Sequence, residues 1–75
     1  MIEIPNLAAD VPDEGAYIRR KDGLVIVFCP KCSDPLTLSK QHKVMFVNGE
    51  LDVGGSIICP CGAHYYIKRG QVEYT

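Results

Sequence analysis

Two closely spaced pairs of cysteines constrain the fold more than any other feature of this 75-residue chain. The first pair is Cys29-Pro30-Lys31-Cys32, and the second is Cys59-Pro60-Cys61. Each pair directly follows a short apolar run and precedes residues that are typical of turns. A structural zinc ion is bound in this way, by a strand that delivers one thiolate and a tight turn that returns a second. We therefore expect one Zn²⁺ per chain, held between the two pairs.

The ligand set has two alternatives, because five side chains compete for four tetrahedral positions. Either all four cysteines bind the metal, or His64 takes the place of Cys59. The second alternative arises because Cys61 and His64 have two residues between them, the regular spacing, whereas Cys59 and Cys61 have only one. We favour the four cysteines, since thiolates are the commoner structural ligands, and His64 stays an open alternative. The candidate metal ligands are therefore Cys29, Cys32, Cys59, Cys61 and His64.

Two other uses of the cysteines fit the sequence less well. Disulfides need an oxidising compartment, and the first residues lack the basic segment of a signal peptide. A redox pair of the thioredoxin type would place Cys29 at the start of a helix, but Ser33-Asp34-Pro35 follows instead. Zinc also suits a chain this short, whose apolar core alone rarely supplies more than about 3–5 kcal/mol. We therefore expect a cytoplasmic domain stabilised by zinc.

Turn signals divide residues 16–75 into short β segments. Three glycine-containing pairs each separate two segments rich in β-branched and aromatic residues, as in hairpins, namely Asp22-Gly23, Asn48-Gly49 and Arg69-Gly70. Gly54-Gly55 predicts a break before a further strand at 56–58, and a turn at 39–42 is the one helix candidate. The sequence predicts a small all-β, zinc-ribbon-like fold of about three hairpins, with two cysteine knuckles bridged by one zinc ion.

Charge separates an N-terminal arm from the rest of the chain. Residues 1–15 contain four acidic residues and no Lys or Arg, whereas residues 16–75 contain eight basic and five acidic residues. With two prolines and no hydrophobic period, residues 1–15 are expected to form an irregular arm whose apolar side chains pack on the domain. Residues 16–75 form the predicted zinc-ribbon-like domain, with edge strands at 16–20 and 71–74.

The segment Cys61-Gly62-Ala63-His64-Tyr65-Tyr66-Ile67, followed by a basic turn and an aromatic final strand, resembles the end of a family of small phage and bacterial metal-binding proteins. Gly15-Ala16-Tyr17-Ile18 and Val44–Val53 resemble the opening and the central hairpin of that family. The resemblance implies a zinc-ribbon-like fold and places His64 at or beside the metal. It also implies a protein partner, because some relatives accompany ubiquitin-like conjugation operons, and it brings no biochemical activity. The chain departs from the family pattern at Gly55, where a proline is expected.

The remaining residues favour binding to another protein. Zinc ribbons often bind nucleic acid, and here the basic residues for that role would be Arg19, Arg20, Lys68 and Arg69. The pI of the chain is about 6.0, however, whereas nucleic-acid-binding domains usually have a pI above about 9. We therefore expect a small interaction module, an adaptor or regulator of phage type, that binds a protein. Nucleic-acid binding is the alternative.

An enzyme or a membrane protein is not expected. A catalytic zinc keeps an open position beside a general base, whereas here the candidate ligands outnumber the four positions. The sequence contains no phosphate-binding loop, no dinucleotide fingerprint and no sign of a small-molecule substrate. Its longest apolar run, Leu24–Cys29, is far shorter than the roughly 20 residues that cross a membrane.

Overall fold

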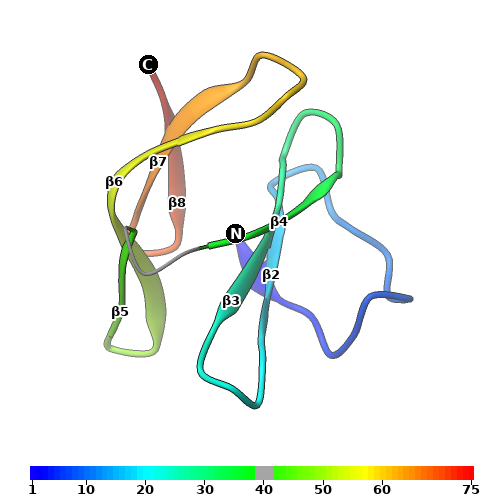
Figure 1. Ribbon diagram of the computed structural model, residues 1–75, viewed down its shortest axis with the longest axis vertical. Coiled ribbons are helices and arrows are strands. Elements are labelled where there is room, and N and C mark those ends of the chain that lie inside the picture. The colour runs from blue at the N-terminus through cyan, green and yellow to red at the C-terminus, as the bar shows by residue number, and fades with distance from the viewer. Residues whose placement is uncertain (39–41) are drawn as a thin grey trace.

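The computed structural model describes residues 1–38 and 42–75, which form β-strands and no helix (Figure 1). The strands are β1 (Ile2–Glu3), β2 (Ala16–Arg19), β3 (Val25–Phe28), β4 (Pro35–Thr37), β5 (Lys43–Val47), β6 (Glu50–Ile58), β7 (His64–Lys68) and β8 (Gln71–Tyr74). They form two four-stranded sheets, with the orders β1-β2-β3-β4 and β5-β6-β7-β8. This confirms the predicted all-β architecture. The helical turn expected at 39–42 falls mainly on residues 39–41, which lie outside the described ones. The described residues contain no helix that is long and apolar enough to cross a membrane.

All three predicted hairpins are present, joining β2 to β3, β5 to β6 and β7 to β8. In the second hairpin Asn48 and Gly49 both have positive φ angles, 52° and 81°. In the third, Arg69 and Gly70 do the same, at 49° and 76°. Turns with positive φ at both central residues match the right-handed twist of the flanking strands, which explains why these pairs mark hairpins.

The edge strand predicted at 16–20 is wrong, because the N-terminal arm supplies a further strand there. β1 pairs in parallel with β2, and the N–H of Ile4 donates to the carbonyl of Tyr17 at 2.9 Å. β2 is therefore an inner strand of the first sheet. β8, the other predicted edge, does lie at the edge of the second sheet. The acidic arm thus enters the sheet at its start and continues as turns up to Gly15.

The strand break predicted at Gly54-Gly55 is also wrong, because β6 continues through it (Figure 1). The pairing of β6 with β7 instead shifts register between Val53 and Ile57. Gly55 has a φ of 93°, which side chains other than hydrogen rarely permit. Such an irregularity bends a strand without ending it. The bend lets one strand run from the β5–β6 turn to the second cysteine pair.

One main core lies between the two sheets. The largest fully buried side chains of this core come from both halves of the chain: Val27, Cys29, Leu38, Leu51, Ile57, Tyr65 and Ile67. One of them, Cys29, is also a candidate metal ligand. On each strand these positions alternate with more exposed ones, as expected of sheets that bury one face. The cysteine pairs therefore extend directly from the strands that form the core.

A smaller cluster covers the opposite face of the first sheet. Ala16 and Phe28 are buried there together with Ile4, and Ala9 and Val11 of the arm pack against them. The apolar residues of the arm thus pack across the sheet, as the sequence predicted. This places the arm on the outer face of β2 and β3.

The burial pattern of the second sheet predicts unequal effects for two isoleucines. Ile67 on β7 is fully buried and Ile58 on β6 is 67% exposed. We expect Ile67→Ala to lower the free energy of unfolding by about 2–5 kcal/mol and Ile58→Ala by less than about 1 kcal/mol. Urea denaturation of the two variants at one fixed zinc concentration measures both. Equal losses would contradict the assignment of the inner and outer faces.

Candidate metal centre

The first cysteine pair occupies a tight turn between β3 and β4. The N–H of Cys29 donates to the carbonyl of Asp34 at 3.0 Å, and the N–H of Ser33 donates to the carbonyl of Cys29 at 2.8 Å. Ser33 has a φ of 64°, in the left-handed region. These two hydrogen bonds reverse the chain and bring Cys32 back toward Cys29.

The second pair, between β6 and β7, forms the same kind of turn with one residue fewer. The N–H of Cys59 donates to the carbonyl of Ala63 at 2.8 Å, and the N–H of Gly62 donates to the carbonyl of Cys59 at 2.9 Å. Gly62 has a φ of 96°. In both turns the residue after the second cysteine is left-handed and bonds the carbonyl of the first. A single residue before Cys61 is therefore enough to form a knuckle.

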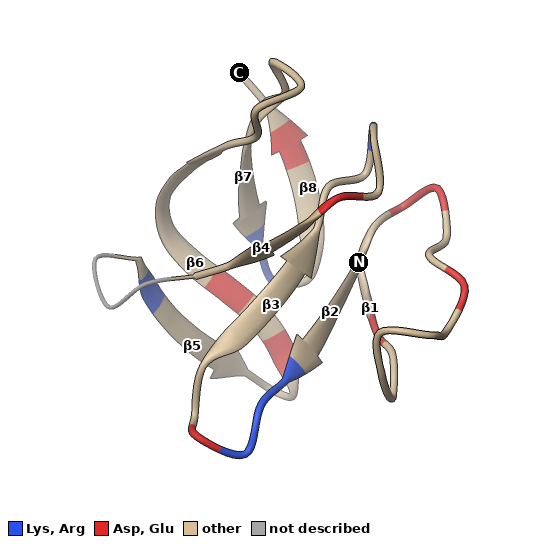
Figure 2. Cartoon of the chain, turned by 45° about the vertical axis from the view of Figure 1, so that its right-hand side comes forward, with Lys and Arg blue, Asp and Glu red and all other residues tan. Residues whose placement is uncertain are grey.

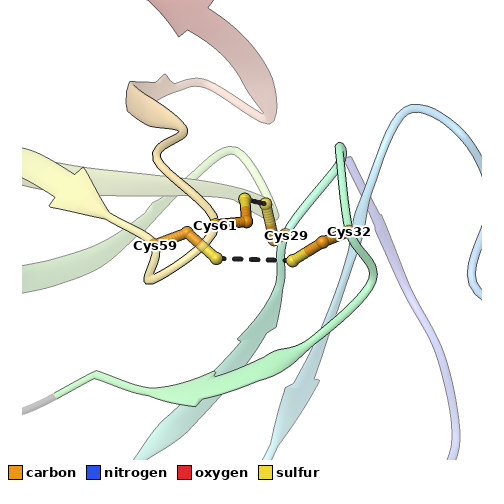
Figure 3. Close-up of side chains that lie close together, drawn as sticks. All are labelled: Cys29, Cys32, Cys59 and Cys61. Atoms are coloured by element: carbon orange, nitrogen blue, oxygen red, sulfur yellow. Dashed lines mark hydrogen bonds between the residues drawn. The ribbon is translucent and has the colours of Figure 1, made fainter.

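The two turns bring four thiols together where β3 and β6 end (Figure 3). All four Sγ atoms lie within 4.8 Å of one another. The Sγ atoms of Cys29 and Cys61 are 3.8 Å apart, and those of Cys32 and Cys59 are 3.4 Å apart. Ligands 2.3 Å from a tetrahedral zinc ion are separated by about 3.8 Å. The cluster therefore fits one tetrahedral metal ion with sulfur ligands, and each short distance joins the first sheet to the second.

His64 lies outside this cluster of described cysteines. On β7 it pairs with the exposed Ile58, whereas its neighbour Tyr65 is buried in the core. Because successive side chains of a strand face opposite sides, His64 faces away from the core, and its ring stacks on Tyr66 with 6.4 Å between centroids. Its Nε2 is covered and has no hydrogen-bond partner within the described residues, but four sulfur atoms already make a complete tetrahedral set. The geometry favours the four cysteines as ligands.

The thiols of the cluster differ in acidity. The backbone of Ala63, followed by the Cys59 sulfur, lowers the pKa of Cys61 to about 7. The backbone of Asp34 also lowers the pKa of Cys32, but the Cys59 sulfur, burial and the other two sulfurs outweigh it and raise this pKa to about 12. Because a bound metal needs thiolates, its binding must displace a proton from Cys32 at neutral pH. Acidification therefore weakens metal binding.

Aromatic side chains brace the first knuckle against the second sheet. The Nζ of Lys31 lies 4.8 Å from the centroid of the Tyr74 ring. That ring meets Tyr65 edge to face at 6.2 Å. Burial, followed by the charges of nearby thiols, raises the pKa of Tyr65 well above its usual range. The contact between Lys31 and Tyr74 could not be found from the sequence, because it joins the first knuckle to a strand of the second sheet.

Arg19, one of the four basic residues considered for nucleic-acid binding, is engaged within the fold. Its Nε lies 3.3 Å from the carboxylate of Glu3 on β1. Its guanidinium carbon lies 3.8 Å from the centroid of Phe46 on β5, a ring that also packs 5.9 Å from Tyr17. Arg19 therefore helps to join the arm and the two sheets.

Two more of these basic residues also lie beside acidic neighbours. Arg20 is 2.9 Å from the carboxylate of Asp22, and Lys68 is 3.6 Å from that of Glu73. For Arg69 the described part of the chain shows no such ion pair. Figure 2 shows both basic and acidic positions on each sheet, with the basic ones at the end of β2 and those near β7 belonging to different sheets. The structure does not bring the four basic residues together into one positive surface.

The four-cysteine assignment predicts that two variants behave differently. Protein purified without chelator should carry one zinc ion per chain in native mass spectrometry. We expect Cys59→Ser to weaken zinc binding by more than about tenfold, because it removes a ligand, and His64→Ala to leave the stoichiometry unchanged. Retention of zinc by Cys59→Ser together with its loss from His64→Ala would show that the histidine is the fourth ligand.

Comparisons with protein-family models, with curated proteins and with solved structures found no match. The similarity to small phage and bacterial metal-binding proteins therefore stays a prediction.

Proposed function

We propose that this chain is a small zinc-stabilised interaction module whose partner is another protein. The metal has a structural role in this proposal, because four thiolates complete a tetrahedral shell and leave no open position for a substrate or an activated water. Zinc is the metal that such a site most often holds in structural modules. A reducing compartment such as the cytoplasm would keep the four thiols available for it. No enzymatic activity is part of the proposal.

One observation carries the choice of a protein partner, and it is the amount of apolar surface left exposed. Five large apolar side chains are 46–67% exposed, namely Ile2, Leu7, Met45, Ile58 and Tyr74. Exposed apolar side chains that gather into patches mark sites of protein interaction. Three of the four basic residues considered for nucleic-acid binding, Arg19, Arg20 and Lys68, lie in contrast beside acidic neighbours. These exposed side chains therefore favour apolar contacts with a protein over electrostatic contacts with the phosphates of a nucleic acid.

Nucleic-acid binding is the second candidate, and one observation favours it. His64 and Tyr66 stack on the outer face of the second sheet, and the Nζ of Lys68 lies 5.6 Å from the Tyr66 ring centroid. Aromatic rings beside a cation form the platforms on which single-stranded nucleic acids stack.

Removal of the metal tests the structural role. We expect EDTA, added in the presence of a reductant, to abolish the cooperative thermal transition, because bound zinc contributes on the order of 10–16 kcal/mol to such small domains. Circular dichroism measures the transition, and excess zinc should restore it. An unchanged melting curve after complete loss of zinc would contradict the proposal.

Titration with labelled oligonucleotides separates the two candidate partners. We expect zinc-loaded protein to show no saturable binding to single-stranded DNA or RNA at low salt in fluorescence anisotropy, because Arg19, Arg20 and Lys68 lie beside carboxylates. Saturable binding that weakens with added salt, and weakens further in Tyr66→Ala and Lys68→Ala, would establish the second candidate instead.

A further inference from the structure

The two sheets have four edge strands, and β5 is the least protected of them. β1 has only two residues, β4 begins with Pro35, and β8 carries Glu73. Each of these features hinders the addition of another strand. β5 has five residues, and after Lys43 its sequence is the apolar run Val-Met-Phe-Val. Among the described strands only β6 pairs with β5, and Figure 1 shows β5 at the left margin of the molecule.

The hydrogen-bond pattern of the hairpin identifies the backbone groups that β5 leaves unpaired. Val47 forms the hydrogen-bonded pair next to the two-residue turn, and from there hydrogen-bonded and non-hydrogen-bonded pairs alternate. The N–H and C=O groups of Phe46 and Val44 therefore point away from β6. The carbonyl of Leu51, opposite Phe46, agrees with this alternation, because it accepts a hydrogen bond from the N–H of Gly70, after β7, rather than from β5. β5 thus presents two donors and two acceptors to which the described backbone supplies no partner.

These groups are arranged so that β5 complements a second copy of itself. When two β5 strands pair antiparallel about a two-fold axis through Met45, Val44 of each chain lies opposite Phe46 of the other. Each such pair exchanges two hydrogen bonds, so that every one of the unpaired groups is satisfied. Met45 then faces Met45 of the second copy, and Lys43 faces Val47. No like charges are opposed in this pairing.

The other long edge strand, β8, lacks this complementarity. By the same alternation, Val72 and Tyr74 have the backbone groups that point away from β7. Antiparallel pairing of two β8 strands through these residues would place Glu73 directly opposite Glu73 of the second copy. Like charges in that position destabilise a strand pair. The sequence therefore opposes self-pairing at β8 and permits it at β5.

We propose that the chain forms a homodimer in which the two β5 strands pair antiparallel and join the second sheets of both copies into one continuous sheet. The Met45 side chains, each 56% exposed in the single chain, contact each other on the outer face of that sheet. A two-fold contact uses the same surface of both copies and stops at two chains. Because the contact is small, the dimer dissociates on dilution. The dimer goes beyond the protein-binding function proposed above and does not depend on it.

Sedimentation equilibrium of the zinc-loaded protein over a dilution series tests the proposal. We expect the average mass to rise with concentration from 8.3 kDa toward twice that value. Met45→Lys and Met45→Glu should each weaken association by about tenfold or more, because like charges then meet at the two-fold axis. An equimolar mixture of the two variants should dimerise again, since opposite charges face each other. Ile58→Lys is the matched control, at a 67% exposed apolar residue of the same sheet, and should dimerise normally.

Amide hydrogen exchange, measured by NMR, tests the hydrogen bonds themselves. We expect the N–H groups of Val44 and Phe46 to exchange more slowly in concentrated than in dilute protein, and this difference to disappear in Met45→Lys. The N–H of Met45, which already bonds within the hairpin, should change less. A mass of one chain at every concentration would overturn the proposal, and so would a dimer that persists unchanged in Met45→Lys. Zinc content and melting temperature establish that each variant is folded.

Discussion

Four cysteine sulfurs connect two sheets that otherwise meet mainly through one small apolar core. Two sulfur–sulfur distances, 3.8 Å between Cys29 and Cys61 and 3.4 Å between Cys32 and Cys59, run from the first sheet to the second. Although the backbone of Asp34 lowers it, the Cys59 sulfur, burial and the other two sulfurs raise the pKa of Cys32 to about 12. A metal ion bound there would displace this proton and would link the two sheets through four thiolates. Because a core of this size supplies only about 3–5 kcal/mol, we infer that the packing of both sheets depends on a metal ion bound by these four cysteines.

The shape of β6 follows from the same requirement. This strand has to pair with β5 at one end and deliver Cys59 to the cluster at the other. A straight strand would keep one direction from the β5–β6 turn to Cys59, so it could not turn toward the cysteine cluster after pairing with β5. The irregularity around Gly55, with its φ of 93°, supplies the bend. The knuckle that follows is one residue shorter than the first, yet its two backbone hydrogen bonds are equivalent. Local backbone freedom thus lets two turns of different length bring their cysteines to one cluster.

Local signals predicted much of this structure, whereas contacts between distant segments escaped them. Asn48-Gly49 predicts a hairpin because its two residues alone determine the turn. The pair Gly54-Gly55 does not show whether a strand ends or only bends there. The outcome depends on whether β7 pairs with β6 both before and after the two glycines, as it does at Val53 and Ile57. The strand at Ile2–Glu3 has no pattern of its own and exists only because β2 offers an open edge. The choice between His64 and Cys59 becomes decidable once β7 is known to begin at His64, because alternation then directs that side chain outward.

The arm illustrates how one segment serves both the fold and a surface. It carries four carboxylates and lies on a body with a net charge of +3, so mutual attraction would suffice to explain its acidity. Only Glu3, however, is paired with a basic residue of that body, Arg19, within the described chain. The other three, Asp10, Asp13 and Glu14, are exposed and have no ion-pair partner among the described residues. The arm is therefore held on the body mainly by the pairing of β1 with β2 and by the apolar contacts of Ile4, Ala9 and Val11, rather than by its carboxylates.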